Sequence, residues 1–185
     1  MLSPRSFRVL AFTTAAFAYL QIALGGVVRV TDSGLGCPDW PLCHGHPYPA
    51  ADIHSIIEYS HRTVGTITGV LLIVTVLAAW VVFRRTRPIV PWLATASLVA
   101  IAAEGAVGGV VEVNELAPWL VVIHLGLALL ILGFLIATAI LSLPAAAGAA
   151  RPGSGGRPPL WGDRAADDRF RQGRRHRRPQ ADRPA

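Results

Sequence analysis

Long runs of apolar residues dominate the first 144 positions of the chain. Four of these runs are long enough to cross a bilayer as helices, at about 7–28, 63–83, 89–111 and 118–143. The second and fourth contain no Asp, Glu, Lys or Arg. The first is too long for a signal peptide and lacks a clear small-residue cleavage site. The pattern therefore predicts an all-α membrane protein, a bundle of four transmembrane helices.

Basic and acidic residues lie on opposite sides of these runs. Arg residues precede the first run and connect the second to the third, whereas the loops after the first and third runs carry mostly acids. The basic positions are Arg5, Arg8, Arg84, Arg85 and Arg87, and the acidic ones are Asp32, Asp39, Asp52, Glu112 and Glu115. Because Arg-rich segments stay in the cytoplasm, we expect a multi-pass plasma-membrane protein with both termini cytoplasmic.

The composition changes abruptly after Pro144. Residues 145–185 hold ten Arg and four Asp, whereas residues 1–144 hold seven Arg and seven acids, so the tail supplies the whole formal charge of +6. A segment this rich in Ala, Gly, Pro and Arg cannot bury enough apolar surface to fold. We therefore predict a transmembrane domain, 1–144, and a disordered cytoplasmic tail, 145–185. Such a tail could touch acidic lipids, and we expect no nucleic-acid partner.

A long outer loop and a weak internal repeat organise the domain. The loop, about 29–57, is dense in Gly, Pro, Trp and His, which is typical of turns and of functional loops. The sequence GGVVRV closes the first run at 25–30, and GGVVEV closes the third at 108–113. Each is followed by a helix with a His near its outer end. The pattern predicts two pseudo-repeated helical hairpins, with coincidence as the alternative because Gly and Val are common in membrane helices.

Titratable side chains gather near the outer ends of the helices. His61 and His124 lie at similar depth on the second and fourth runs, and facing His residues in a bundle can hold a haem iron. A purely structural role for each is the alternative. Glu58 shares a helix face with His61 and could serve chemistry there or pair with Arg62. Arg29 and Arg62 suit the propionates of a haem, or simple anchoring at the interface.

Three more residues are candidates. Cys37 and Cys43 lie six positions apart in the outer loop, where a disulfide can form. They could staple the loop or act as a redox pair, whereas a metal site with His44 and His46 lacks tetrahedral spacing. Glu104 is the one acid inside a span, suited to a proton relay or to an interhelical hydrogen bond.

Two long motifs resemble a known family. Residues 25–45, GGVVRVTDSGLGCPDWPLCHG, resemble the first outer loop of bacterial haem A synthases, and residues 54–62, HSIIEYSHR, resemble the signature that opens their second helix. The resemblance covers about residues 10–143 and the N-terminal four-helix half of that family. It implies oxidation of the methyl group of haem O to the formyl group of haem A, for terminal oxidase biogenesis.

The resemblance also implies roles for individual residues. His61 and His124 match the His pair that holds the substrate haem, Glu58 matches the catalytic acid, and Cys37 and Cys43 match the loop cysteines. The family usually has eight spans and a haem b cofactor in its second half, which has no counterpart here. A homo-oligomer could rebuild two sites, or the chain could be a truncated or frameshifted, inactive half. Haem O synthase, cytochrome oxidase assembly and membrane lipids are the expected partners.

Three other functions share some of these features. A b-type haem protein for electron transfer would use the same His pair without methyl oxidation. A thiol–quinone oxidoreductase would use Cys37 and Cys43. A non-enzymatic assembly partner of an oxidase would use neither set.

Overall fold

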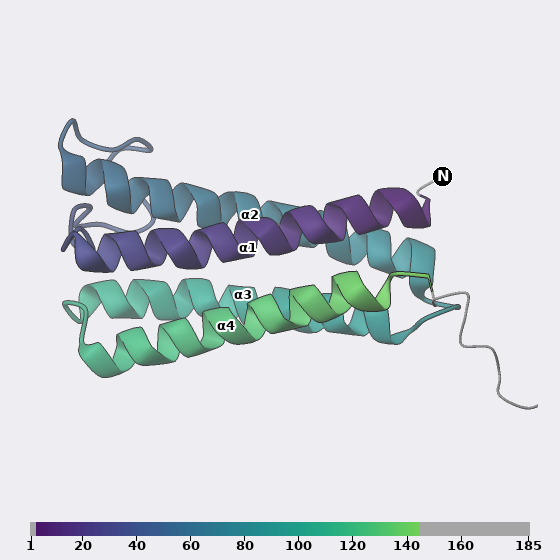
Figure 1. Ribbon diagram of the computed structural model, residues 1–185. Coiled ribbons are helices and arrows are strands. Elements are labelled where there is room, and N and C mark those ends of the chain that lie inside the picture. Colours follow the sequence, from purple (N-terminus) through teal and green to yellow (C-terminus); the bar gives the residue numbers. More distant parts are fainter. Residues whose placement is uncertain (1–2, 145–185) are drawn as a thin grey trace, which may run out of the picture. The chain divides into compact units, whose positions relative to one another are not determined.

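Four long helices form the part of the chain that the computed structural model describes, residues 3–144, and this part contains no strand (Figure 1). Their bounds are Pro4–Val30 for α1, Ile53–Phe83 for α2, Ile89–Val113 for α3 and Pro118–Leu141 for α4. Each is long and apolar enough to cross a membrane. The expected all-α, four-span fold is confirmed, while the tail predicted to be disordered lies outside the described residues.

The helices pair as two antiparallel hairpins, α1–α2 and α3–α4, that lie side by side (Figure 1). Each helix also contacts one helix of the other hairpin, α1 with α4 and α2 with α3. Within residues 3–144, no Cα atom of α2 comes within 8 Å of one of α4, so these two helices stand diagonally across the bundle. We call the end that carries the loop 31–52 the loop end, and the opposite end, where residues 3 and 144 lie, the terminal end.

Helix α2 begins ten residues before its apolar run. Asp52 has an extended backbone and caps the helix, because its carboxylate accepts a hydrogen bond from the Ser55 amide at 3.0 Å. The polar stretch 54–62 is therefore helical, and the outer loop is shorter than the 29–57 expected from hydropathy. Because of this extension, Glu58 and His61 lie on the same continuous helix as the membrane-spanning segment.

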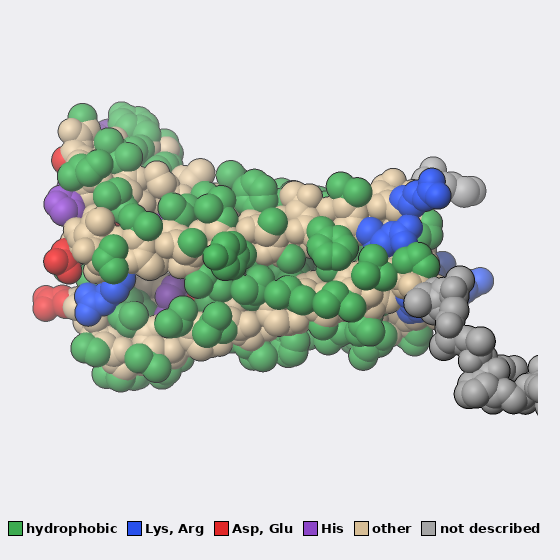
Figure 2. Space-filling view, in the orientation of Figure 1, with side chains coloured by type: hydrophobic (Ala, Val, Ile, Leu, Met, Phe, Trp, Pro, Cys, Tyr) green, Lys and Arg blue, Asp and Glu red, His purple; other side chains and the backbone are tan. Residues whose placement is uncertain are grey.

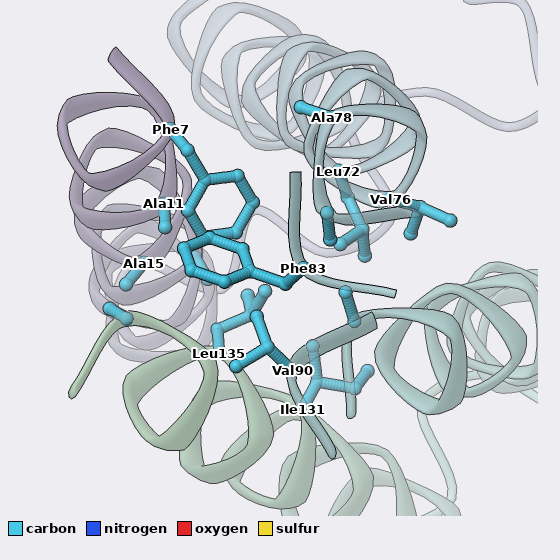
Figure 3. Close-up of a cluster of buried hydrophobic side chains, with 14 residues drawn as sticks. Phe7, Ala11, Ala15, Leu72, Val76, Ala78, Phe83, Val90, Ile131 and Leu135 are labelled. Atoms are coloured by element: carbon cyan, nitrogen blue, oxygen red, sulfur yellow. The ribbon is translucent and has the colours of Figure 1, made fainter. Parts of the chain in front are cut away.

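The terminal end is filled by a hydrophobic core (Figure 3). Phe7 of α1 and Phe83 of α2 pack edge to face with ring centroids 5.0 Å apart, and Leu72 and Leu135 are fully buried members of the same cluster. In a bilayer such contacts stabilise mainly through close packing, since lipid is as apolar as the side chains. The core fixes how the two hairpins sit against each other.

Charged groups separate along the bundle. On the face shown in Figure 2, acidic side chains gather at the loop end, and most of the basic ones lie at the terminal end. Arg87 ties the α2–α3 turn to the end of α4 by donating to the carbonyls of Leu141, at 2.8 Å, and Leu143.

Candidate functional site

Two histidines occupy equivalent places in the two hairpins near the loop end. A Cβ added at Gly25 of α1 would lie 3.1 Å from Cε1 of His61, and one added at Gly108 of α3 would lie 3.3 Å from Cε1 of His124. Gly25 and Gly108 are the first residues of the two repeated segments. The sequence repeat thus recurs as the same helix–glycine–imidazole contact in each hairpin.

Each imidazole also faces a polar side chain one turn before its glycine. The amide nitrogen Nε2 of Gln21 lies 3.2 Å from Nε2 of His61. Oε1 of Glu104 lies 3.2 Å from Nδ1 of His124, an ion-pair distance at which the two atoms are not aligned for a hydrogen bond. Within residues 3–144, Nδ1 of each imidazole is therefore buried and has no hydrogen bond. The same is true of Oε1 of Gln21 and of Oε2 of Glu104.

Such atoms are rare in folded proteins, and each needs an explanation, such as a role in binding an ion or a ligand. Four of them lie on four different helices in the same half of the bundle. A histidine side chain is visible in the seam between the two hairpins in Figure 2. The site therefore offers imidazoles on diagonal helices, and it is not closed by its own hydrogen bonds.

Glu58 lies one turn above His61 in a buried ion-pair network. Its side chain pairs with Arg62 at 2.5 Å, and Arg62 pairs with Glu112 of α3 at 2.7 Å. The second oxygen of Glu58 accepts a hydrogen bond from the Cys37 amide at 2.8 Å. Glu58 is only 5 % exposed, so these two partners compensate for its loss of water.

Arg62 also holds the outer loop against α2. Its guanidinium donates to the carbonyls of Asp39 and Leu42, both at 2.6 Å, and to that of Cys37 at 3.0 Å. This arginine was expected at a haem propionate, and the structure places both of its terminal nitrogens on protein partners. Arg29 is exposed and, among residues 3–144, has no hydrogen bond or ion pair.

The disulfide expected in the loop is present. Cys37 and Cys43 are bonded, with Cα atoms 4.6 Å apart, and both residues are fully buried. Directly after the ring that they close, the Cys43 and His46 backbones exchange two hydrogen bonds. Since no sulfur is open to solvent, the staple interpretation fits better than a redox pair.

The loop touches α2 backbone to backbone at Gly36. A Cβ there would lie 2.5 Å from the carbonyl carbon of His54 and 2.7 Å from the Ser55 nitrogen. Ser55 donates to the Gly36 carbonyl at 2.6 Å, and His54 contacts Ser33 at 3.0 Å. Only glycine allows this approach, which brings the Cys37 amide within reach of Glu58.

A pocket of about 760 Å³ opens between the loop and α3. Trp40 lies over Gly109, where a Cβ would be 3.8 Å from the indole, and Glu112 lines the same pocket. Neither histidine is among its lining residues. This pocket therefore lies beside the outer loop at the loop end and is separate from the space between the imidazoles.

Comparison with known proteins decides the family. The profile of the COX15-CtaA family, described as cytochrome oxidase assembly protein, matches residues 8–56 and 51–158, which is more than half of the chain. The chain belongs to this family.

Curated relatives of this COX15-CtaA member carry the name heme A synthase. The protein of Bacillus licheniformis is 34 % identical over 119 residues, covering 64 % of this chain and 39 % of its own length. That of Geobacillus thermodenitrificans is 32 % identical over 129 residues, covering 68 % and 40 %. That of Exiguobacterium sibiricum is 34 % identical over 113 residues, covering 60 % and 38 %. The chain spans about two fifths of the length of these relatives.

Sequence reasoning named most residues of this candidate site in advance but did not single out two of the polar ones. Gln21 is neutral and Glu112 was taken only as an outer acid, so neither stood out. Alignment of the repeat could have found both, because Gln21 corresponds to Glu104 and Glu112 to Arg29 when Gly25 is placed on Gly108.

Proposed function

We propose that this chain performs haem A synthase chemistry: it binds haem O and converts one methyl group to a formyl group, producing haem A. The electrons of this oxidation would leave through a second haem or a quinone, and water or dioxygen would supply the formyl oxygen. The observation that carries the proposal is the pair of repeat-related imidazoles on diagonal helices, each beside a glycine. Membership of the COX15-CtaA family and the relatives named heme A synthase support it.

His61 and His124 would hold the iron of the haem. Among residues 3–144, Nδ1 of His61 and Nε2 of His124 have no hydrogen-bond partner, while the other nitrogen of each ring faces Gln21 or Glu104. Imidazoles from facing helices are a usual way to hold haem. Haem itself supplies the redox centre and the reacting methyl group. A haem b cofactor, expected from the resemblance, would require a second His pair, such as that of another copy of the chain.

Glu58 would act on the methyl group that is oxidised. It lies one turn from His61, is buried, and keeps its carboxylate oriented by Arg62 and the Cys37 amide. A fixed anion of this kind can stabilise positive charge developing at a carbon undergoing oxidation, or accept the proton that leaves it. Arg62 then acts by orienting Glu58, while a propionate remains its predicted alternative partner.

Arg29 suits a haem propionate best. It is exposed near the loop end, one turn beyond Gly25, and its fork geometry matches a carboxylate. We further propose that the loop end faces outward and both termini lie in the cytoplasm. The separation of acids and arginines along the bundle supports this orientation.

The deciding experiment is expression together with a haem O synthase, followed by purification in detergent and extraction of the bound haems. The wild-type chain should yield haem A. The Glu58→Gln variant keeps the shape of the side chain and should retain haem O but form no haem A. Glu115→Gln is the matched control, because Glu115 is an exposed acid in the α3–α4 turn.

Three results would contradict the proposal in different places. Haem A in the Glu58→Gln variant would remove the catalytic role of Glu58. Haem b or haem O alone in the wild type would favour an electron-transfer protein. A colourless wild-type preparation would favour an assembly partner without haem chemistry.

A further inference from the structure

The two histidines differ in the residue that holds them. His61 faces the amide of Gln21, and His124 faces the carboxylate of Glu104, at the same distance of 3.2 Å. Gln21 and Glu104 stand four residues before Gly25 and Gly108, so they are the same position of the internal repeat. The two hairpins therefore place a polar side chain beside each imidazole, at Nε2 of His61 and at Nδ1 of His124, and they differ in the functional group of that side chain.

The position of Glu104 is costly without a partner. It lies nine residues before Val113, the end of α3, about 14 Å from that end at the usual rise of a helix, and its side chain is only 13 % exposed. An acid at such depth is expensive and functional by default. His124 is the one side chain within ion-pair distance of it among residues 3–144, and its second oxygen has no hydrogen bond.

Gln21 is also held in place. A Cβ added at Gly65 of α2 would lie 3.0 Å from the amide nitrogen of Gln21, so the absence of a side chain at Gly65 leaves room for this amide. Gln21 thus lies against Gly65 and His61, which are one turn apart on the same helix. An amide can donate or accept, whereas an ionised carboxylate only accepts.

A carboxylate behind a metal-bound histidine has a known physical effect. By accepting the proton of the nitrogen that faces away from the metal, it fixes the tautomer and the ring orientation and makes the imidazole a stronger donor. A neutral amide orients the ring with less added electron density. Negative charge beside the ligand also favours the more positive, ferric state of the iron.

We propose that Gln21 and Glu104 are paired positioning residues for the axial ligands, and that Glu104 makes His124 the stronger of the two. This inference rests on the proposed function, since it requires His61 and His124 to bind iron. It assigns a purpose to the buried acid of α3 and makes the two faces of the bound haem chemically unequal.

The test uses the full chain in detergent, titrated with iron protoporphyrin IX as the probe. Affinity is followed by absorbance, and the midpoint potential is measured by spectroelectrochemistry. Glu104→Gln should weaken binding of the ferric form roughly 10-fold, the lower end of the usual loss for such partners. If only the ferric form is weakened, the potential rises by about 59 mV for that tenfold change.

The reverse substitution supplies the matched comparison. Gln21→Glu adds a carboxylate behind His61 and should lower the potential, and the double variant Gln21→Glu/Glu104→Gln should return it close to the wild-type value. Glu115→Gln removes an acid with no contact to either histidine and should change neither quantity. Circular dichroism shows that each variant keeps its helices.

Opposite shifts in the two single variants would support the inference. Wild-type affinity and potential in Glu104→Gln, or shifts of both variants in the same direction, would overturn it while leaving haem binding intact. Failure of the wild-type chain to bind the porphyrin at all would instead overturn the proposed function, and this inference with it.

Discussion

At the terminal end of the bundle, aromatic and aliphatic side chains from both hairpins interlock, with Phe7 packed on Phe83. At the loop end, the same helices bring together glycines, imidazoles, an amide and carboxylates, several of them buried without hydrogen bonds. The terminal half of each helix thus contributes to the packing that stabilises the fold, and the other half contributes to the candidate ligand site. In a bilayer this division is costly, because buried polar groups must find partners.

The difference teaches how a small membrane protein can keep an open polar site. The terminal core fixes the hairpins, and the Arg62 network fastens the loop over the opposite end. Changes at the terminal end should therefore alter stability, and changes at the loop end should alter ligand binding. The following predictions test that separation.

The largest effect should come from removing an axial ligand. His61→Ala or His124→Ala should weaken haem binding by more than about 100-fold, since even changes behind a ligand cost up to that factor. Absorbance titration measures it. His46→Ala is the control, because His46 is an exposed loop residue stacked on Tyr48. Haem bound equally well in either ligand variant would refute the site.

The core should respond in the opposite way. Phe83→Ala should reduce the free energy of unfolding by about 3 kcal/mol, because it leaves a cavity beside Phe7, yet leave haem affinity nearly unchanged. Unfolding by denaturant in detergent gives the first value. Phe12→Ala is a matched control, since Phe12 is 48 % exposed on the same bundle. A large loss of haem affinity in Phe83→Ala would show that the two ends are coupled.

The hold of Arg62 on the loop should be measurable through the disulfide. Arg62→Gln removes charged hydrogen bonds to three loop carbonyls, worth about 2 kcal/mol together after losses to water. We expect the loop to open roughly 30-fold more often, and a thiol reductant to cleave Cys37–Cys43 correspondingly faster. In the Arg29→Gln variant the same disulfide should be cleaved at the wild-type rate. Equal rates in both variants would mean that the loop is held by other contacts.

The glycine beside His61 should set its position. Gly25→Val would press a side chain against the imidazole, where even a Cβ lies 3.1 Å from Cε1, and should weaken haem binding about tenfold, as for other disturbances of a ligand's surroundings. Gly26→Val is the neighbouring control, because a Cβ at Gly26 meets nothing within 4 Å. The same titration compares them, and similar affinities would show that the ring can move freely.

The smallest effect concerns pH. The Ser55 side chain and amide lower the pKa of the Asp52 carboxyl below its usual 3.8. A lowered pKa in the folded state gives stability that is present above the unfolded value and is lost as the pH falls through the folded one. We expect the amides in the first turn of α2 to lose protection against hydrogen exchange, relative to their intrinsic rate at each pH, below about pH 3.8. Asp52→Asn still caps a helix and should lack this pH dependence.

Hydropathy and repeat analysis could predict the helices and the histidines because both follow from local sequence. Apolar runs set the four spans, and the shared Gly-Gly-Val-Val segments pointed to equivalent histidines. The start of α2 at residue 53 was not predictable from hydropathy, because a cap and not an apolar residue begins it. The pairing of Arg62 with Glu112 was also hidden, since fifty positions separate them and only the packing of α2 on α3 brings them together.

The bare backbone at Gly36 has a consequence for how the acid above His61 is tuned. Since a methyl group there would collide with the peptide joining His54 to Ser55, any replacement pushes the neighbouring cysteine's amide away from the Glu58 oxygen that it binds. Gly36 therefore determines the hydrogen bonding of the buried Glu58 carboxylate, although it has no side chain and does not contact that carboxylate. At Gly34 an added Cβ would meet only the flexible side chain of Leu116, so a replacement there should not displace the backbone in this way.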